Sequence, residues 1–172
     1  MSTAAKFLEI AQAEVGTVEG PKDNETKYGK FTKMDFQPWC GSFVMWVAKQ
    51  AGIKVPNCVY TPAGKSGFQG LGTWSNAETA KPKPGDIVFF DFVEGGAAVE
   101  HVGIVLKNNK DGTITTIEGN TSPEGKAKGS QANGGQVAIR TRAFKAKNKR
   151  GLLPFVVGFG RPAFKAESKE IE

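Results

Sequence analysis

The stretch PWCGSFVMWVAKQAG, residues 38–52, decides the fold, because it combines a strong helix signal with a reactive side chain. Apolar residues stand three, four, seven, eight and eleven places after Cys40, a spacing that lines one buried face of a helix. Pro38 suits the first helical position, since its missing N–H would be unpaired there, and Gly52 ends the helix. We therefore predict a helix over 38–51 with the cysteine in its first turn.

Working outward from this helix, residues 3–15 carry the same periodicity and predict a first helix, capped by Ser2 or Thr3. The stretch 17–37 is polar and rich in turn signals, so we expect it to be irregular. Residues 53–83 are rich in Gly, Pro and Ser and predict a long loop. Loops of this length in a domain usually carry function.

The second half of the chain alternates short apolar runs with turns, which is typical of β-strands. Asp111–Gly112 predicts a tight hairpin. Helices followed by strands indicate an α+β domain in which N-terminal helices pack on an antiparallel sheet. The expected strands are 86–92, 101–106, 113–118, 136–144 and 155–159.

The composition is that of a globular domain: 172 residues, of which 39% are hydrophobic and 23% charged. We expect a catalytic domain over 1–163 and a charged tail or linker stub over 164–172. No apolar run approaches the ~20 residues that cross a bilayer. The start shows no signal peptide, so we expect synthesis in the cytosol, with any action outside the cell only after release.

The formal charge of +6 favours polyanionic partners, although such a charge can also serve solubility alone. Nucleic acid is disfavoured, because the lysines are scattered and no recognition motif is visible. The basic stretch FKAKNKR, residues 144–150, is either a solvated loop or a contact for anionic wall polymers.

Cys40 is the first candidate for chemistry. Unpaired backbone N–H groups and the positive end of the dipole lie where a helix begins, and both favour a thiolate over a thiol. A cysteine on an apolar stripe can also be a plain core residue. The position in the first turn favours a nucleophile, because a structural cysteine gains nothing from it.

His101 is the only histidine, so any imidazole base must be this residue. Alone, it would be read as a half-exposed polar residue, but a thiolate and an imidazolium stabilise each other. A tight hairpin would pair His101 near Ser122. Either Glu118 or Asn120, two apart on one strand face, could then orient the ring.

Cys58 is expected to be a small buried apolar residue rather than a disulfide partner of Cys40. The two cysteines form no CxxC pair, and a single histidine leaves no zinc ligand set. We predict no metal and no cofactor.

Four motifs follow one another in the order PWCGSFVMW, KPGDIVFFDF, EHVGIV and TIEGNTS. In this order they resemble a CHAP domain, the cysteine, histidine-dependent amidohydrolase/peptidase of bacteriophage endolysins and bacterial wall hydrolases. The resemblance spans residues 4–162. It implies a papain-like fold in which the helix with the cysteine packs on the sheet with the histidine.

The resemblance also implies roles for individual residues. Cys40 would be the nucleophile, His101 the base, Glu118 the orienting carboxylate and Asn120 a further polar member of the site. The turn 84–86 would have a structural role.

Two departures from the family pattern lie before the cysteine. Some relatives bind calcium there through alternating aspartates, whereas this chain has only Asp23 and Glu25, so we predict no calcium site. Several relatives place glutamine directly before the nucleophile, whereas Gln37 stands three places earlier. The backbone N–H of Cys40 is therefore the expected oxyanion donor. The residues expected to contact glycan or stem peptide are Tyr28, Gln37, Trp39 and Trp74.

Together these expectations describe a monomeric peptidoglycan hydrolase of the endolysin type. The amide cleaved would be either the N-acetylmuramoyl-L-alanine bond or a peptide bond of the stem or cross-bridge. A non-catalytic wall-binding module and a cysteine acyltransferase on the same fold are the alternatives. The expected partners are peptidoglycan and anionic wall polymers.

Overall fold

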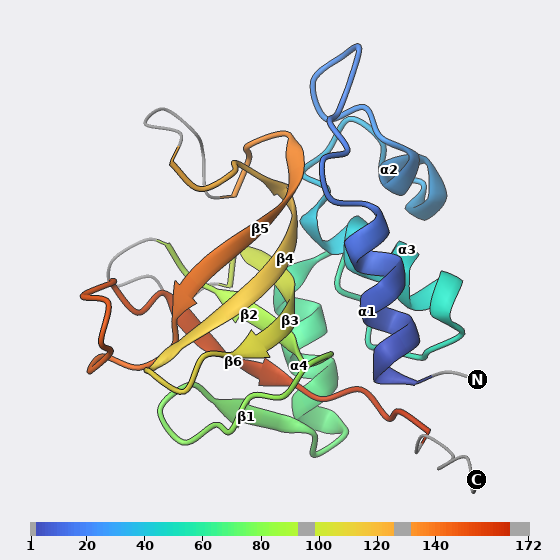
Figure 1. Cartoon of the computed structure of the whole chain (residues 1–172). Coiled ribbons are helices and arrows are strands. Elements are labelled where there is room, and N and C mark those ends of the chain that lie inside the picture. Colours follow the sequence, from blue (N-terminus) through green and yellow to red (C-terminus); the bar gives the residue numbers. More distant parts are fainter. Residues whose placement is uncertain (1–2, 93–98, 126–131, 166–172) are drawn as a thin grey trace, which may run out of the picture.

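The computed structural model describes residues 3–92, 99–125 and 132–165, and within them four helices lie against a six-stranded sheet (Figure 1). This arrangement confirms the expected α+β class. The helices are α1 (Ala4–Ala13), α2 (Lys27–Thr32), α3 (Cys40–Ala51) and α4 (Thr61–Gly70). The strands are β1 (Trp74–Asn76), β2 (Ile87–Phe90), β3 (His101–Asn108), β4 (Thr113–Thr121), β5 (Gln136–Ala143) and β6 (Val156–Gly160).

Helix α3 forms as the periodicity predicts, with an apolar face buried against the sheet. It begins at Cys40 rather than Pro38, with Trp39 as the N-cap residue. Gly52 ends it in the left-handed conformation, at φ 67°. The cysteine is therefore the first residue of the helix, closer to its amino end than expected.

Two helices were missed, because both lie in stretches whose composition favours turns. Helix α2 lies inside the stretch 17–37 and is capped by the Thr26 side chain, which accepts from the backbone of Gly29. Helix α4 lies inside the predicted loop 53–83 although glycine has low helix propensity. Its glycines allow close packing instead: a β-carbon on Gly67 would lie 2.5 Å from Pro56 Cβ.

The sheet has the strand order β1-β6-β2-β3-β4-β5, and every neighbouring pair is antiparallel. The β3–β4 hairpin forms at Asp111–Gly112 as predicted, and the recorded pairs include Ile104 with Ile117. A bulge between Val105 and Lys107 shifts the register. The expected pairing of His101 near Ser122 is therefore wrong.

The two faces of the sheet have different neighbours. Phe89 pairs with Val102, and both lie in the core that α1 and α3 cover. One residue further along β2, Phe90 pairs with His101, and Phe90 belongs to the apolar cluster on the other face. The imidazole thus stands at the first position of β3, next to Phe90 of the neighbouring strand.

Candidate active site

Cys40 occupies the amino end of α3 and is 4% exposed. Burial raises the pKa of a thiol, but here the charge of His101, a hydrogen bond with its side chain and the backbone N–H groups of Val102 and Gly41 together outweigh burial. The net result is a lowered pKa for Cys40. The start of α3 and the start of β3 therefore meet at the sulfur.

His101 is fully buried, and its ring lies against Phe90 and Phe92 at centroid distances of 5.6 and 5.7 Å. Burial lowers the pKa of an imidazole, yet the charges of Cys40 and Glu118 raise the pKa of His101 to about 9. The two shifts favour a thiolate–imidazolium pair at neutral pH.

The two nitrogens of the His101 ring have different surroundings. Nε2 lies 2.9 Å from the carboxylate oxygen Oε2 of Glu118. Nδ1 is buried and makes no hydrogen bond to a nitrogen or oxygen atom of the described residues. Charge attraction and a side-chain hydrogen bond both couple His101 to Cys40, so the nitrogen that Glu118 does not occupy is available for a proton in transit.

Glu118 is the centre of a buried network. Its carboxylate accepts a hydrogen bond from the Oγ1 hydroxyl of Thr116 at 2.6 Å. It also accepts two hydrogen bonds from the guanidinium of Arg142, at 2.8 Å from Nε and at 2.6 Å from Nη2. Burial alone would raise the pKa of this acid, but Arg142 and His101 hold it well below its ordinary value. Glu118 is therefore a carboxylate at neutral pH, where the imidazole is charged.

Asn120, the other candidate for orienting the ring, is committed elsewhere. Its side-chain amide donates to Asn24 at 3.3 Å and to Asn133 at 3.0 Å, and its oxygen accepts from the backbone of Gly135. The choice that the sequence left open between Glu118 and Asn120 therefore falls on Glu118 as the neighbour of His101.

Arg142 is the member of the network that sequence reasoning missed. It lies on β5 and stacks over Phe90 and Phe92, with its guanidinium 5.2 and 5.0 Å from the two ring centroids. The available signal was Arg140 and Arg142 at alternate positions of the otherwise mostly apolar strand QVAIRTRA. A buried arginine needs a carboxylate partner, and Glu118 is that partner.

Gly103 leaves the space that the Glu118 side chain occupies. A β-carbon at Gly103 would lie 2.7 Å from Cγ of Glu118. The glycine of the EHVGIV motif is therefore required by the network that orients the histidine.

Two of the aromatic residues expected to contact substrate are core residues instead. Tyr28 and Trp39 are fully buried, and their rings stack at 5.3 Å. The indole of Trp39 donates to Glu19 at 2.8 Å, and the hydroxyl of Tyr28 donates to Glu14. The prediction that these two side chains line a substrate groove is wrong, because neither reaches the surface.

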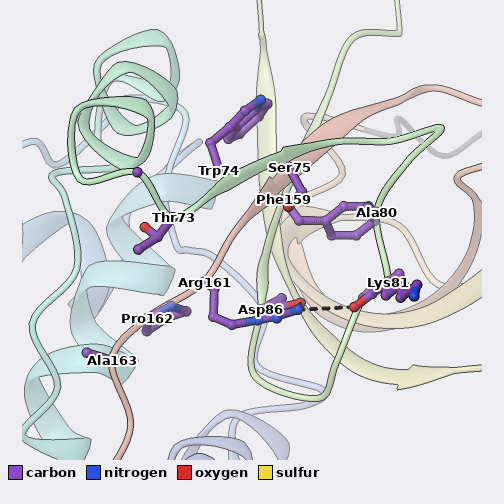
Figure 2. Close-up of a pocket in the computed structure, with 12 residues that line it drawn as sticks. Thr73, Trp74, Ser75, Ala80, Lys81, Asp86, Phe159, Arg161, Pro162 and Ala163 are labelled. Carbon is purple, nitrogen blue, oxygen red and sulfur yellow. Dashed lines mark hydrogen bonds and ion pairs between the residues drawn. The ribbon is translucent and has the colours of Figure 1, made fainter.

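Of the other two, Gln37 is exposed just before α3, close in sequence to Cys40. Trp74 lies in the edge strand β1, where it lines a cavity of about 330 Å³ together with Asp86 and Arg161. Figure 2 shows the Trp74 ring pointing away from the Asp86–Arg161 pair. That cavity contains none of the residues around Cys40.

Cys58 is a free, fully buried thiol, and Cys40 is free as well. Burial raises the pKa of Cys58 to about 12. The prediction of a small buried residue outside a disulfide is confirmed.

Before the cysteine, Glu25 pairs with Lys30 at 2.9 Å, and Asp23 accepts from Asn24 at 3.1 Å. In the part of the chain that the structure describes, no three His, Cys, Asp or Glu residues gather as metal ligands. Over the same residues, no helix has the length and apolar character that crossing a membrane requires.

Comparisons with known proteins agree with this geometry. The CHAP domain family profile matches residues 32–120, a span that contains Cys40, His101 and Glu118. A search of curated proteins finds no significant match.

Solved structures with the same fold include Ly7917 and the wild-type endolysin LysIME-EF1, each with a TM-score of 0.51 and 16% sequence identity. The match covers 93% of this chain and 62% of Ly7917, and 96% of this chain and 67% of LysIME-EF1. An NLP/P60-family protein from Staphylococcus aureus has a TM-score of 0.48 at 16% identity, over 92% of this chain and 40% of that one. The chain thus spans about 62% of the length of the first of these. The expected papain-like fold is confirmed.

Proposed function

The chain belongs to the CHAP domain family, and from this premise we propose that it is a cysteine-dependent peptidoglycan hydrolase that cleaves an amide bond of the bacterial wall. The observation that supports this proposal best is a buried row of interacting side chains of alternating charge: Cys40, His101, Glu118 and Arg142. This arrangement stabilises a thiolate next to a protonated base. It matches the requirements of nucleophilic amide hydrolysis.

In the first half of the proposed reaction, the Cys40 thiolate attacks the amide carbonyl and forms a C–S bond. The carbonyl oxygen takes up the electron pair, and the unpaired backbone N–H at the start of α3 stabilises its charge. Imidazolium at His101 gives its proton to the amide nitrogen as the C–N bond breaks. An amine leaves and a thioester remains.

In the second half, neutral His101 removes a proton from water, and the resulting hydroxide attacks the thioester carbon. The C–S bond breaks, the carboxylic acid product leaves, and the thiolate–imidazolium pair is restored. Glu118 stays ionised throughout and keeps the ring oriented, and Arg142 holds Glu118.

We propose either the N-acetylmuramoyl-L-alanine bond or a stem or cross-bridge peptide bond as the site of cleavage. Gln37 is the predicted substrate contact that remains, because it is exposed beside the nucleophile. We further propose that the enzyme is a monomer. It would act on the wall after release from a host cytoplasm, as a bacteriophage endolysin does.

The test compares Cys40→Ala with the matched variant Cys58→Ala on purified sacculi. We expect Cys40→Ala to lose at least about a thousandfold in the rate of turbidity loss, because the nucleophile is gone. Cys58→Ala should keep wild-type chemistry, since Cys58 is buried outside the network. Product masses and new amino termini then identify the bond. Full lysis by folded Cys40→Ala would refute the proposal, and wild-type binding without cleavage would favour a non-catalytic module.

A further inference from the structure

A second concave site lies at the hairpin end of β3, away from the cysteine. Its open cavity of about 540 Å³ is formed by three chain segments: 80–83 before β2, 108–112 around the β3–β4 turn, and 144–145 after β5. We call it the lysine groove, because Lys81, Lys83, Lys110 and Lys145 line it.

Among the residues that the structure describes, no carboxylate lines the lysine groove. Asp86, close by, is bound by Arg161 through two contacts of 2.8 Å, and Figure 2 shows this pair together with Lys81. Asp111 is bound by Arg150 at 3.0 Å.

The other acid at this end is Glu78, which is exposed and accepts from the backbone of Ala146 at 3.3 Å. None of the four lysines forms an ion pair with a described residue. Four ammonium groups around one cavity repel each other, and an anionic ligand would relieve that repulsion.

The basic stretch 144–150 extends the same surface. Its turn packs against the hairpin, since a β-carbon on Gly112 would lie 2.8 Å from the carbonyl oxygen of Lys147. The backbone of Lys149 donates to Asp111 at 2.9 Å. Tertiary packing therefore gathers lysines that are scattered in the sequence.

The lysine groove and the cysteine lie at opposite ends of β3. The strand runs from His101 to Asn108, and at about 3.3 Å per residue its ends are roughly 23 Å apart. A long polymer held in the groove would leave the nucleophile free.

We propose that the lysine groove binds a linear polyol-phosphate polymer of the bacterial wall. The choice of a wall polymer rests on the proposed function, whereas the preference for phosphate rests on four lysines around one cavity, none in an ion pair with a described residue. Single-stranded nucleic acid fits less well, because Phe144, the aromatic residue of the lining, is 4% exposed and offers no ring for base stacking. A membrane fits less well too, since a flat surface cannot reach lysines across a cavity.

Binding of purified poly(glycerol phosphate) tests the proposal by calorimetry at two salt concentrations. The groove variant changes Lys81, Lys83, Lys110 and Lys145 to Gln. The control variant changes Lys22, Lys33, Lys49 and Lys54 to Gln, four lysines that are exposed elsewhere, so both lose the same charge. We expect the groove variant to bind about tenfold more weakly or worse, with a shallower salt dependence, and the control to bind nearly as wild type. Equal weakening in both, or tighter binding of single-stranded DNA of matched charge, would overturn the proposal.

A cleavage assay separates this proposal from the proposed function. On sacculi stripped of phosphate polymer, wild type and groove variant should cleave at equal rates. On polymer-bearing sacculi the groove variant should be slower, and equal rates there would contradict a role in wall binding. Absence of cleavage by wild type on stripped sacculi would refute the hydrolase and leave the binding result intact.

Discussion

Cys40 and Cys58 are both buried thiols, yet their pKa values move in opposite directions. Burial acts on both, and at Cys58 it raises the pKa to about 12. At Cys40 the charge of His101 and two backbone N–H groups outweigh burial and lower the pKa. The difference lies in the neighbours of each sulfur rather than in its exposure.

Alkylation by iodoacetamide measures this difference directly. We expect one cysteine of the native protein to react, Cys40, and its rate to level off at a lower pH than that of an ordinary thiol, because its lowered pKa makes the thiolate abundant earlier. In His101→Ala the rise in rate should move towards the ordinary thiol pKa of 9.0. Cys58→Ala serves as the control and should react like wild type. A wild-type rate that rises only above pH 8 would contradict the ion pair.

Loss of Arg142 would leave the buried carboxylate of Glu118 without its guanidinium partner. We expect Arg142→Met to lower the free energy of unfolding by about 3–5 kcal/mol, because Glu118 would stay buried without its bidentate partner. The matched control is Arg150→Met, since Arg150 is 51% exposed in its pair with Asp111. That solvent-screened pair should contribute far less than the buried one. Urea unfolding measures both, and equal losses would mean that the buried pair adds no more than the surface pair.

At the scale of elements, the site depends on how closely α3, β3 and β4 approach. A β-carbon on Gly41 would lie 1.9 Å from the carbonyl oxygen of Cys58, and one on Gly119 would lie 2.6 Å from Cβ of Phe43. Glycines thus let the start of α3 sit directly on its neighbours. The position of the sulfur follows from these backbone contacts.

Gly103→Ala tests the same principle in β3. The new methyl group would displace Glu118, and overpacking of this kind costs about 1–3 kcal/mol in the free energy of unfolding. We also expect slower alkylation of Cys40 at pH 7, because a displaced Glu118 no longer orients His101. Gly70→Ala, at the end of α4 with no atom within 4 Å of the added carbon, is the control. Unchanged stability and alkylation in Gly103→Ala would show that Glu118 can move without consequence.

At the scale of the whole molecule, Glu118 links the stability of the fold to pH. Its folded-state pKa lies below the ordinary 4.5, because Arg142 and His101 stabilise the carboxylate despite burial. A group with a depressed pKa stabilises the fold above its unfolded pKa, and that contribution is lost as the pH falls.

We therefore expect the free energy of unfolding to decline between about pH 5 and about pH 3. The decline should be shallower in Glu118→Gln, which has no carboxylate to protonate, whatever its stability at neutral pH. Urea unfolding at a series of pH values gives the slopes. Asp111→Asn removes an exposed acid whose pKa is lowered to about 2 and serves as the comparison. Identical slopes for wild type and Glu118→Gln would contradict a depressed pKa at Glu118.

The sequence by itself determined the α+β class, the helix of Cys40, the hairpin and the strands other than β1, and the candidates Cys40, His101 and Glu118. These depend on local periodicity, on turn residues and on motifs a few residues long, all of which can be seen without the partner segments. Each local preference here agrees with the final structure, except in α2, α4 and β1, where tertiary packing overrides composition.

Only the tertiary structure decided between Glu118 and Asn120, brought Arg142 to the carboxylate, buried Tyr28 and Trp39, and gathered the lysines of the groove. The first two depend on which residues meet across strands, and a single bulge in β3–β4 changes that register. The other two depend on how helices and turns pack together. Contacts between segments distant in sequence arise from close packing and charge pairing in three dimensions, and no local pattern encodes them.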